Sequence, residues 1–371
     1  MIRASRSWQG RTMARVGRGG LLILLLGLSS SGAWARSTRD HIGVYYFPGW
    51  LTSDWAPKGA WEPIKAYPDR EPLLGWYDQK SKEVLARQLH WMAQYHLDYV
   101  VMDWYYEQGA VRLDEGLKAF LAVPQSQIKL SLLWANHGEQ TTPAIFRAIT
   151  QAWILRYFSS SNYLTKDGRP VVFIFSYDKL AADARASGSS VKYYLDIAQS
   201  MAKSSGLKGI YFVADVDDFS PAQIENGAAA AGFSAVSSYQ FHRKPQVDEA
   251  IDPHWGRPTH GWTELATAYQ AQWRAGLKLS IPMVVPMISG LDRRPWGGFP
   301  NDSLHDRSLA TDQQFKSHLA AARRTMTQTT IPHSRLGVIC CWNEYGEGAF
   351  VEPTRANGFK RLSAIKSVFG H

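Results

Sequence analysis

The chain has little cysteine and no hydrophobic run long enough to cross a bilayer. Its two cysteines, Cys340 and Cys341, are adjacent within an apolar run, so we predict that they fill core space as small hydrophobic residues and form no disulfide bond. No cysteine lies near the N-terminal apolar run "LLILLLGL", which excludes lipid attachment there. That run is far shorter than the roughly 20 residues of a spanning helix.

Motifs for several common chemistries are also absent. The sequence contains no Gly-rich phosphate loop of the Walker type and no "GxSxG" elbow, which weighs against nucleotide-dependent enzymes and serine hydrolases. His137, His254 and His260 are the alternatives for metal binding, but no Cys or His pair has ligand spacing on a defined element. We therefore predict that the protein uses neither a metal nor another cofactor.

The N-terminus has the pattern of a secretory signal peptide. Five arginines precede the apolar run, which leads into the small-residue stretch "SSSGAWA", so we predict cleavage after Ala35. An uncleaved anchor is the alternative. The first 35 positions contain these five arginines and no acidic residue, so removal of the segment lowers the formal net charge from +9 to +4. We predict a secreted or periplasmic protein with no stable membrane insertion after cleavage.

No clustered Lys/Arg stripe is left in the mature chain, so we predict no nucleic-acid partner. We expect a monomer. No internal repeat or low-complexity linker divides the chain, so residues 36–371 are predicted to form one domain.

Short apolar runs alternate with helical patterns along this domain. Near-continuous apolar strands between helices indicate a parallel sheet buried on both faces, and eight of them predict a closed (β/α)8 barrel, or TIM barrel, with elaborated loops. The strands are expected within residues 41–50, 97–106, 128–139, 169–178, 209–218, 233–241, 281–296 and 335–348. We also predict that the long loops at residues 49–76 and 240–262 shape a cleft.

Polar and aromatic residues follow several of these strands. In a parallel barrel the carboxyl ends of all strands meet at one face, where active sites are built. A loop residue with ordinary hydrogen bonds is the simpler explanation for any one of them, but the pattern recurs from strand to strand. Sugar rings pack on Trp and Tyr, while Asp, Asn and Glu bond to hydroxyls. The predicted sugar contacts are Tyr46, Asp103, Trp104, Trp134, Asn136, His137, Tyr239, Asp292, Trp296, Asn343, Tyr345 and Glu352.

Two glutamates in "CWNEYGEGAFVEPT" are candidates for chemistry. Glycosidic bond cleavage needs one protonated carboxyl and a second carboxylate. Glu344 and Glu347 are three positions apart; a helical turn after Trp342 would bring their Cβ atoms to about 5 to 6 Å, nearer the retaining than the inverting geometry. The alternative is a loop in which one glutamate is exposed and the other forms a salt bridge.

The motif "WNEYGEGAFVEP" resembles the "WNEW.EG..LEP" signature of glycoside hydrolase family 99-like proteins, a group that includes the WbsX-like polysaccharide-locus proteins. Further segments resemble that group in the same order, from residue 41 to about residue 365: "YYFPGW", "GWYDQ", "LLWAN", "GRPVVFIF" and "DRRPW". Two features differ: Tyr345 replaces the usual Trp of the motif, and "WANHGEQ" lacks the second Trp that often follows "WAN".

The resemblance implies a (β/α)8 barrel and a retaining, endo-acting hydrolase that needs no metal. It implies that Glu344 acts as a base on the 2-hydroxyl of the substrate, giving a 1,2-anhydro sugar, and that Glu347 is the acid and then the base. An axial 2-hydroxyl suits that mechanism, so an α-mannoside or a related α-linked polysaccharide is the expected substrate. An α-glucan, a non-catalytic polysaccharide-binding barrel, and a glycosyltransferase are the alternatives; the predicted signal peptide and the absent phosphate loop weigh against the last.

Overall fold

The computed structural model describes residues 39–52, 56–123, 126–241, 250–252, 257–259, 261–297, 308–329, 331 and 335–370. The predicted signal peptide at residues 1–35 lies outside the described residues, as do His254, His260 and parts of both long loops. No helix in the described ranges is both long enough and apolar enough to cross a membrane.

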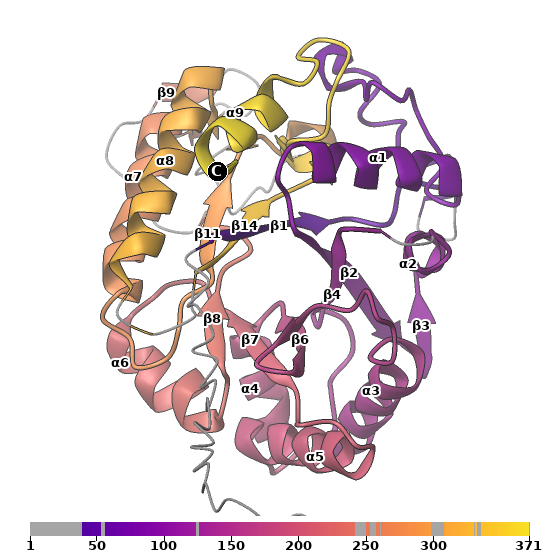
Figure 1. The fold of residues 1–371 in the computed structure, drawn as a ribbon, viewed down its shortest axis with the longest axis vertical. Coiled ribbons are helices and arrows are strands. Elements are labelled where there is room, and N and C mark those ends of the chain that lie inside the picture. Colours follow the sequence, from indigo (N-terminus) through magenta and orange to yellow (C-terminus); the bar gives the residue numbers. More distant parts are fainter. Residues whose placement is uncertain are drawn as a thin grey trace, which may run out of the picture. The chain divides into compact units, whose positions relative to one another are not determined.

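Eight parallel strands form a barrel (Figure 1), which confirms the predicted fold. They pair in the order β11-β14-β1-β2-β4-β6-β7-β8. The two end strands meet through Val236, whose N–H donates to the Pro282 carbonyl and whose carbonyl accepts from Val284 N–H, each at 2.9 Å. The strands are β1 (His41–Tyr46), β2 (Tyr99–Glu107), β4 (Lys129–Trp134), β6 (Arg169–Ile174), β7 (Tyr211–Asp215), β8 (Ala235–Ser237), β11 (Val285–Ile288) and β14 (Leu336–Cys340).

Helices follow most strands and cover the outside of the barrel (Figure 1). Ser81, Thr142, Ser176, Ser190 and Thr311 each cap a helix by accepting from an N–H in its first turn, which satisfies a backbone donor that the helix leaves unpaired. The helices are α1 (Lys82–Gln94), α2 (Glu115–Leu121), α3 (Pro143–Arg156), α4 (Tyr177–Ala186), α5 (Val191–Ser204), α6 (Pro221–Ile224), α7 (Trp262–Gly276), α8 (Asp312–Gln328) and α9 (Lys360–Phe369).

Short elements decorate the loops. A π-helical turn, η2 (Glu225–Ala229), continues α6, and three 3-10 turns are η1 (Pro68–Arg70), η3 (Arg294–Trp296) and η4 (Tyr345–Glu347). The minor strands are β3 (Ala110–Arg112), β5 (Thr165–Lys166), β9 (Ala250–Asp252), β10 (Arg257–Thr259), β12 (Gly290–Leu291), β13 (Ser308–Leu309), β15 (Asn343–Glu344) and β16 (Ala349–Phe350).

Alternation along the strands divides the core into two layers. Successive side chains of a strand point to opposite faces. Tyr45, Val101 and Phe173 belong to the cluster inside the barrel, whereas the neighbouring Tyr46 and Met102 belong to the layer between strands and helices. The same alternation decides which residue at the end of each strand points into the barrel mouth.

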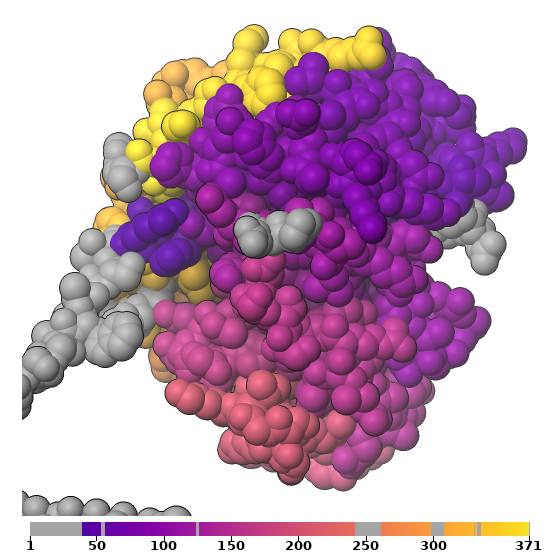
Figure 2. Space-filling model, turned by 45° about the vertical axis from the view of Figure 1, so that its right-hand side comes forward, coloured from indigo at the N-terminus to yellow at the C-terminus, as the bar shows by residue number. Residues whose placement is uncertain are grey.

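The long loop after β1 lies beside the C-terminal segment. Leu73 N–H donates to the Pro353 carbonyl at 2.8 Å, and Arg355 N–H donates to the Glu71 carbonyl at 2.9 Å; Figure 2 shows the two segments meeting as indigo to purple and yellow surface. The loop's aromatic residues form a third buried cluster with Tyr345. The sequence motif that carries the two glutamates is thereby held from outside by residues almost 300 positions away.

Candidate active site

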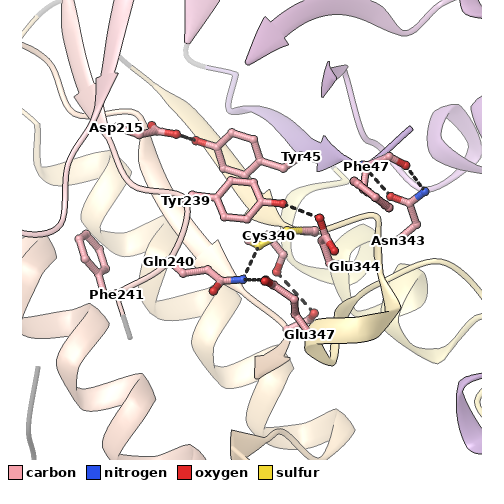
Figure 3. Close-up of a disulfide and its surroundings, with 12 residues drawn as sticks. Tyr45, Phe47, Asp215, Tyr239, Gln240, Phe241, Cys340, Asn343, Glu344 and Glu347 are labelled. Carbon is pink, nitrogen blue, oxygen red and sulfur yellow. Dashed lines mark hydrogen bonds between the residues drawn. A yellow bond between two sulfur atoms is a disulfide. The ribbon is translucent and has the colours of Figure 1, made fainter. Parts of the chain in front are cut away.

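Glu344 and Glu347 lie together at the carboxyl end of β14 (Figure 3). Glu344 ends β15 and is the N-cap of the 3-10 turn η4, and Glu347 is the last residue of that turn. Glu344 Oε1 accepts a hydrogen bond from Tyr239 Oη at 3.0 Å, and Glu347 Oε2 accepts one from Gln240 Nε2 at 2.6 Å. The helical turn considered after Trp342 is thus replaced by a short strand, and a 3-10 turn begins only at Tyr345.

Two further carboxyls, Asp103 from β2 and Asp215 from β7, lie near this pair. Burial, followed by the charges of Glu347 and Asp103, raises the pKa of Glu344 well above its ordinary value. Burial also raises the pKa of Asp103, helped by Glu347 and Asp215. Asp215 accepts hydrogen bonds from Tyr45 Oη at 2.9 and 3.1 Å, and its pKa is raised by burial. At the mouth of the barrel, the ionisation of one carboxyl therefore makes the ionisation of its neighbours less favourable.

This cluster is not arranged as a metal site. Among the residues that the structure describes, no group of three or more His, Cys, Asp or Glu side chains could hold a metal ion. Asp103 is 7% exposed, and its Oδ1 has no hydrogen-bond partner. A buried oxygen without a partner favours the neutral form of the carboxyl.

Cys340 and Cys341 form a disulfide bond, so the prediction that they would remain unbridged is wrong. Both residues are fully buried inside the barrel, as expected for small hydrophobic residues. Alternation places neighbouring side chains of a strand on opposite faces, but β14 ends at Cys340. Cys341 already belongs to the turn that follows, and this allows the two sulfur atoms to meet.

A buried ion pair fixes the backbone of residues 344–347, the turn that carries both glutamates and is called the glutamate turn below. Arg70 Nη2 lies 2.7 Å from Asp292 Oδ2, and Arg70 Nη1 donates to the carbonyl of Tyr345 at 2.6 Å. Burial alone would raise the pKa of Asp292, but hydrogen bonds from Arg294 and the charge of Arg70 outweigh burial and lower it. Asp292 N–H also donates to the Glu347 carbonyl at 2.5 Å. Asp292, a predicted sugar contact, thus lies behind the turn with its carboxylate paired to arginines.

Asn343 holds the start of the loop after β1. Its Oδ1 accepts from Phe47 N–H and its Nδ2 donates to the Phe47 carbonyl, both at 2.9 Å. Trp50 Nε1 donates to the Asn343 carbonyl at 3.0 Å. These bonds use the Asn343 amide to join β1 to the glutamate turn, on the side away from the carboxyl pair.

Glu352 is the centre of a buried network on the α1 side of the barrel. It accepts hydrogen bonds from Tyr77 Oη, Tyr345 Oη and Gln88 Nε2 at 2.8, 3.0 and 2.7 Å, and Gln88 Oε1 accepts from Tyr46 Oη at 2.6 Å. Tyr46, Tyr345 and Glu352 are 2% exposed or less. The structure therefore places these three predicted sugar contacts behind the turn.

Glu352 should make stability depend on pH. Burial raises its pKa from 4.5 to about 7, so the folded state holds this proton more tightly than the unfolded state, and stability declines as the pH rises between those values. Glu352→Gln has no such proton. The free energy of unfolding of Glu352→Gln minus that of wild type should therefore be about 2 kcal/mol larger at pH 8 than at pH 5. Urea denaturation at both pH values measures this; parallel pH dependence in the two proteins would contradict it.

Trp104 and Trp134 belong to the outer layer of the barrel. Both rings pack against Trp153 of α3, at centroid distances of 5.6 and 6.0 Å, and Trp104 Nε1 donates to Tyr157 Oη at 3.2 Å. Asn136 exchanges two hydrogen bonds with the backbone of Ser176, at 2.8 and 2.9 Å. The structure does not bring these three residues to the glutamates.

His137 does lie on the side of the mouth that leads to the pair. It is exposed and packs edge-on against Tyr105 and Phe175, at 5.9 and 5.6 Å. Phe175 contacts Tyr239 at 5.4 Å, and Tyr239 bonds to Glu344. These rings form a continuous aromatic row at the ends of β2, β4, β6 and β8.

Trp296 covers the glutamate turn from the other side. An added Cβ on Gly346 would lie 1.9 Å from the Trp296 ring, so only glycine allows this ring to lie so close to the turn. Trp296 also stacks at 6.1 Å on Trp50 of the loop after β1. Of the predicted contacts, Asp103 and Tyr239 therefore lie beside the carboxyl pair and Trp296 covers its turn, whereas His137 lies further along the aromatic row.

Sequence reasoning missed several residues of the mouth. Tyr45, Tyr105, Phe175 and Asp215 occupy inward positions at the ends of strands, and Gln240 follows Tyr239. The alternation of side chains was the signal for the first four, because each belongs to the inner core or lies two or four residues from one of its members. No sequence signal marked Gln240.

A parallel barrel with a close carboxyl pair at the carboxyl ends of its strands has the architecture of glycoside hydrolase-like proteins. Residues 65–365 match the family model described as glycosyltransferase WbsX, and the chain belongs to that family.

Solved structures share the fold. A glycoside hydrolase-like protein has a TM-score of 0.66 and 14% identity, over 91% of this chain and 95% of that chain. The GH99 endo-alpha-mannosidase from Bacteroides thetaiotaomicron in complex with bis-tris propane has a TM-score of 0.61 and 13% identity, over 89% and 97%. A second structure of that mannosidase has a TM-score of 0.58 and 14% identity, over 89% of this chain and 96% of that chain. A comparison with curated protein sequences found no match.

Proposed function

We propose that the protein is a retaining endo-glycoside hydrolase that cleaves a polysaccharide, with Glu344 and Glu347 as its catalytic residues. The observation that carries the proposal is the placement of these two carboxyls side by side, each held by its own donor, at the end of the barrel where active sites are built. The match to a sugar-active family and the glycoside hydrolases of the same fold support it.

In the proposed mechanism, Glu344 removes the proton of the sugar 2-hydroxyl. The oxygen at C2 attacks the anomeric carbon, the bond to the leaving oxygen breaks, and Glu347 protonates that oxygen. Glu347 then takes a proton from water, the water oxygen attacks the anomeric carbon and opens the 1,2-anhydro ring, and Glu344 returns its proton to the oxygen at C2. Two inversions give retention. Burial raises the pKa of Glu344, which makes it a stronger base than an exposed glutamate.

We propose an α-mannoside or a related α-linked glycan as substrate, because an axial 2-hydroxyl stands opposite an axial leaving group, as attack from C2 requires. Asp103, His137, Tyr239 and Trp296 are the residues that we propose to contact the sugar. We further propose that the protein is secreted or periplasmic. The Cys340–Cys341 disulfide supports this proposal, because disulfide bonds persist in oxidising compartments.

Digestion of a polysaccharide array, followed by product sizing and by NMR analysis of the anomers, tests the proposal. We expect oligosaccharide products from at least one α-linked polymer and retention of the anomeric configuration in the first product. Release of monosaccharide alone would replace endo with exo cleavage. Inverted products would exclude the proposed role of Glu344.

A glycosyltransferase is the second candidate, because the family model carries that description. Calorimetric titration with nucleotide sugars distinguishes the two activities, since a transferase has to bind its donor. A third possibility is a barrel that binds polysaccharide without cleaving it. It would bind glycans on the array and release no products.

A further inference from the structure

Two consecutive residues after β8 each contact one member of the carboxyl pair. Tyr239 donates to Glu344 and Gln240 donates to Glu347, and Figure 3 shows both side chains reaching toward the pair from the same side. Tyr239 is half-buried and belongs to the aromatic row, whereas Gln240 is 7% exposed. Gln240 is thus almost covered and offers little surface to a sugar.

The Gln240 amide has a second contact that fixes its orientation. Nε2 lies 2.6 Å from Glu347 Oε2 and 3.4 Å from Cys340 Sγ. The sulfur belongs to a disulfide, so it carries no proton and can only accept. Because the carboxylate and the sulfur are both acceptors, the NH₂ end of the amide has to face them. One amide group therefore spans the space between the disulfide and Glu347.

We propose that Gln240 is the positioning residue of Glu347 and that the Cys340–Cys341 disulfide is the support that holds Gln240 in place. This inference rests on the proposed function for its catalytic consequence, but the arrangement itself can be tested without activity. Gln240 acts through Glu347 and takes no part in bond making or breaking. The disulfide acts one step further back, through the orientation of the amide.

The arrangement has a chemical consequence for the proton of Glu347. An N–H donor stabilises the ionised carboxylate more than the protonated acid, so removal of the donor increases the proton affinity of Glu347. The carboxyl also loses its fixed rotamer, and a displacement of about 1 Å can reduce a catalytic rate about 100-fold. If Gln240 only filled space, its replacement by a side chain of the same size would change neither the proton affinity nor the placement of Glu347.

The first experiment compares Gln240→Met with Gln199→Met. Methionine keeps the size of glutamine without its donor. Gln199 is a matched control because its amide also makes two hydrogen bonds, both to the backbone of Ile210 at 2.9 Å, at a site where β7 begins. We expect the two variants to lose similar stability in urea. Activity on the polymer found by the array should fall about 10- to 100-fold in Gln240→Met alone.

A direct titration separates this inference from the proposed function. The side-chain carboxyl of Glu347 is followed by ¹³C NMR of protein labelled at glutamate, with its signal assigned from Glu347→Gln. We expect its titration midpoint to rise by about one pH unit in Gln240→Met and to stay in place in Gln199→Met. If activity is measurable, the pH at which Gln240→Met loses activity on the alkaline side should shift upward by the same amount. An unchanged midpoint would overturn the role of Gln240, even if the protein proves to be a hydrolase.

The role of the disulfide is tested in the same way. Cys340→Ala/Cys341→Ala removes the supporting sulfur atoms, and we expect the Glu347 midpoint to shift in the same direction as in Gln240→Met. The effects should be non-additive, because both changes act through one amide. If the double alanine variant does not fold, Cys340→Val/Cys341→Ala provides the comparison, because it fills more of the space and still offers Gln240 no acceptor. Additive shifts, or no shift on loss of the disulfide, would overturn the supporting role while leaving that of Gln240.

Discussion

Glu344→Gln and Glu347→Gln should each reduce polysaccharide cleavage at least about 100- to 10,000-fold, the range that general acid–base groups contribute. Glutamine keeps the size of each side chain and still offers an oxygen to Tyr239 or Gln240, so folding should be retained. The two losses should not add in the double variant, because the residues serve one reaction. Initial rates of product release on the polymer found by the array, with circular dichroism as the check on folding, measure this.

Glu62→Gln is the matched control for this experiment. Glu62 pairs with Lys65 on the surface, where its side chain is 51% exposed, and it lies outside the glutamate turn. Its variant should keep full activity. Full activity in Glu344→Gln or in Glu347→Gln would contradict the proposed catalytic pair.

Arg70→Met should lower the free energy of unfolding by about 3 kcal/mol. Removal of one partner of a buried ion pair leaves the other charge buried without it, and Arg70 and Asp292 are both almost fully buried. Arg294 also pairs with Asp292, which limits the loss to the lower end of the usual 3–5 kcal/mol. Activity should fall as well, because Arg70 holds the Tyr345 carbonyl next to the glutamates. Urea denaturation and initial rates measure the two effects.

The pH dependence of that loss identifies its cause. The paired Asp292 has a lowered pKa, so its contribution to stability is present above the ordinary aspartate value of 3.8 and disappears as the pH falls through the lowered value. The difference between Arg70→Met and wild type should therefore shrink below about pH 4. Arg355→Met breaks the exposed pair with Glu71 and should cost less than about 1 kcal/mol. A loss of equal size in both variants would contradict a special role for Arg70.

The sequence predicted the strands of the barrel well, because parallel strands buried on both faces are read as nearly continuous apolar runs. It was less informative about the mouth. At the ends of β1 and β2 it did not separate Tyr45 from Tyr46 or Asp103 from Trp104, although alternation sends the first of each pair inward and the second toward the helices. An inward core residue such as Val101 would have fixed the side to which each neighbour points.

Other features depend on partners that no local pattern reveals. Asp292 and Glu352 look like site residues in the sequence, because Asp292 follows the seventh strand and Glu352 follows the two glutamates. Their partners Arg70 and Gln88 lie 222 and 264 positions away, and only the closed barrel brings them together. The support of the glutamate turn is thus a property of the tertiary structure.

The Cys340–Cys341 disulfide differs in one respect from most protein disulfides. A cross-link stabilises a fold mainly by reducing the conformational entropy of the unfolded chain, and this effect grows with the length of the loop that it closes. Here the sequence separation is one residue, so the unfolded chain loses almost no freedom. The value of this bond to the protein must therefore lie in the local order of the folded state, beside Gln240 and the two glutamates.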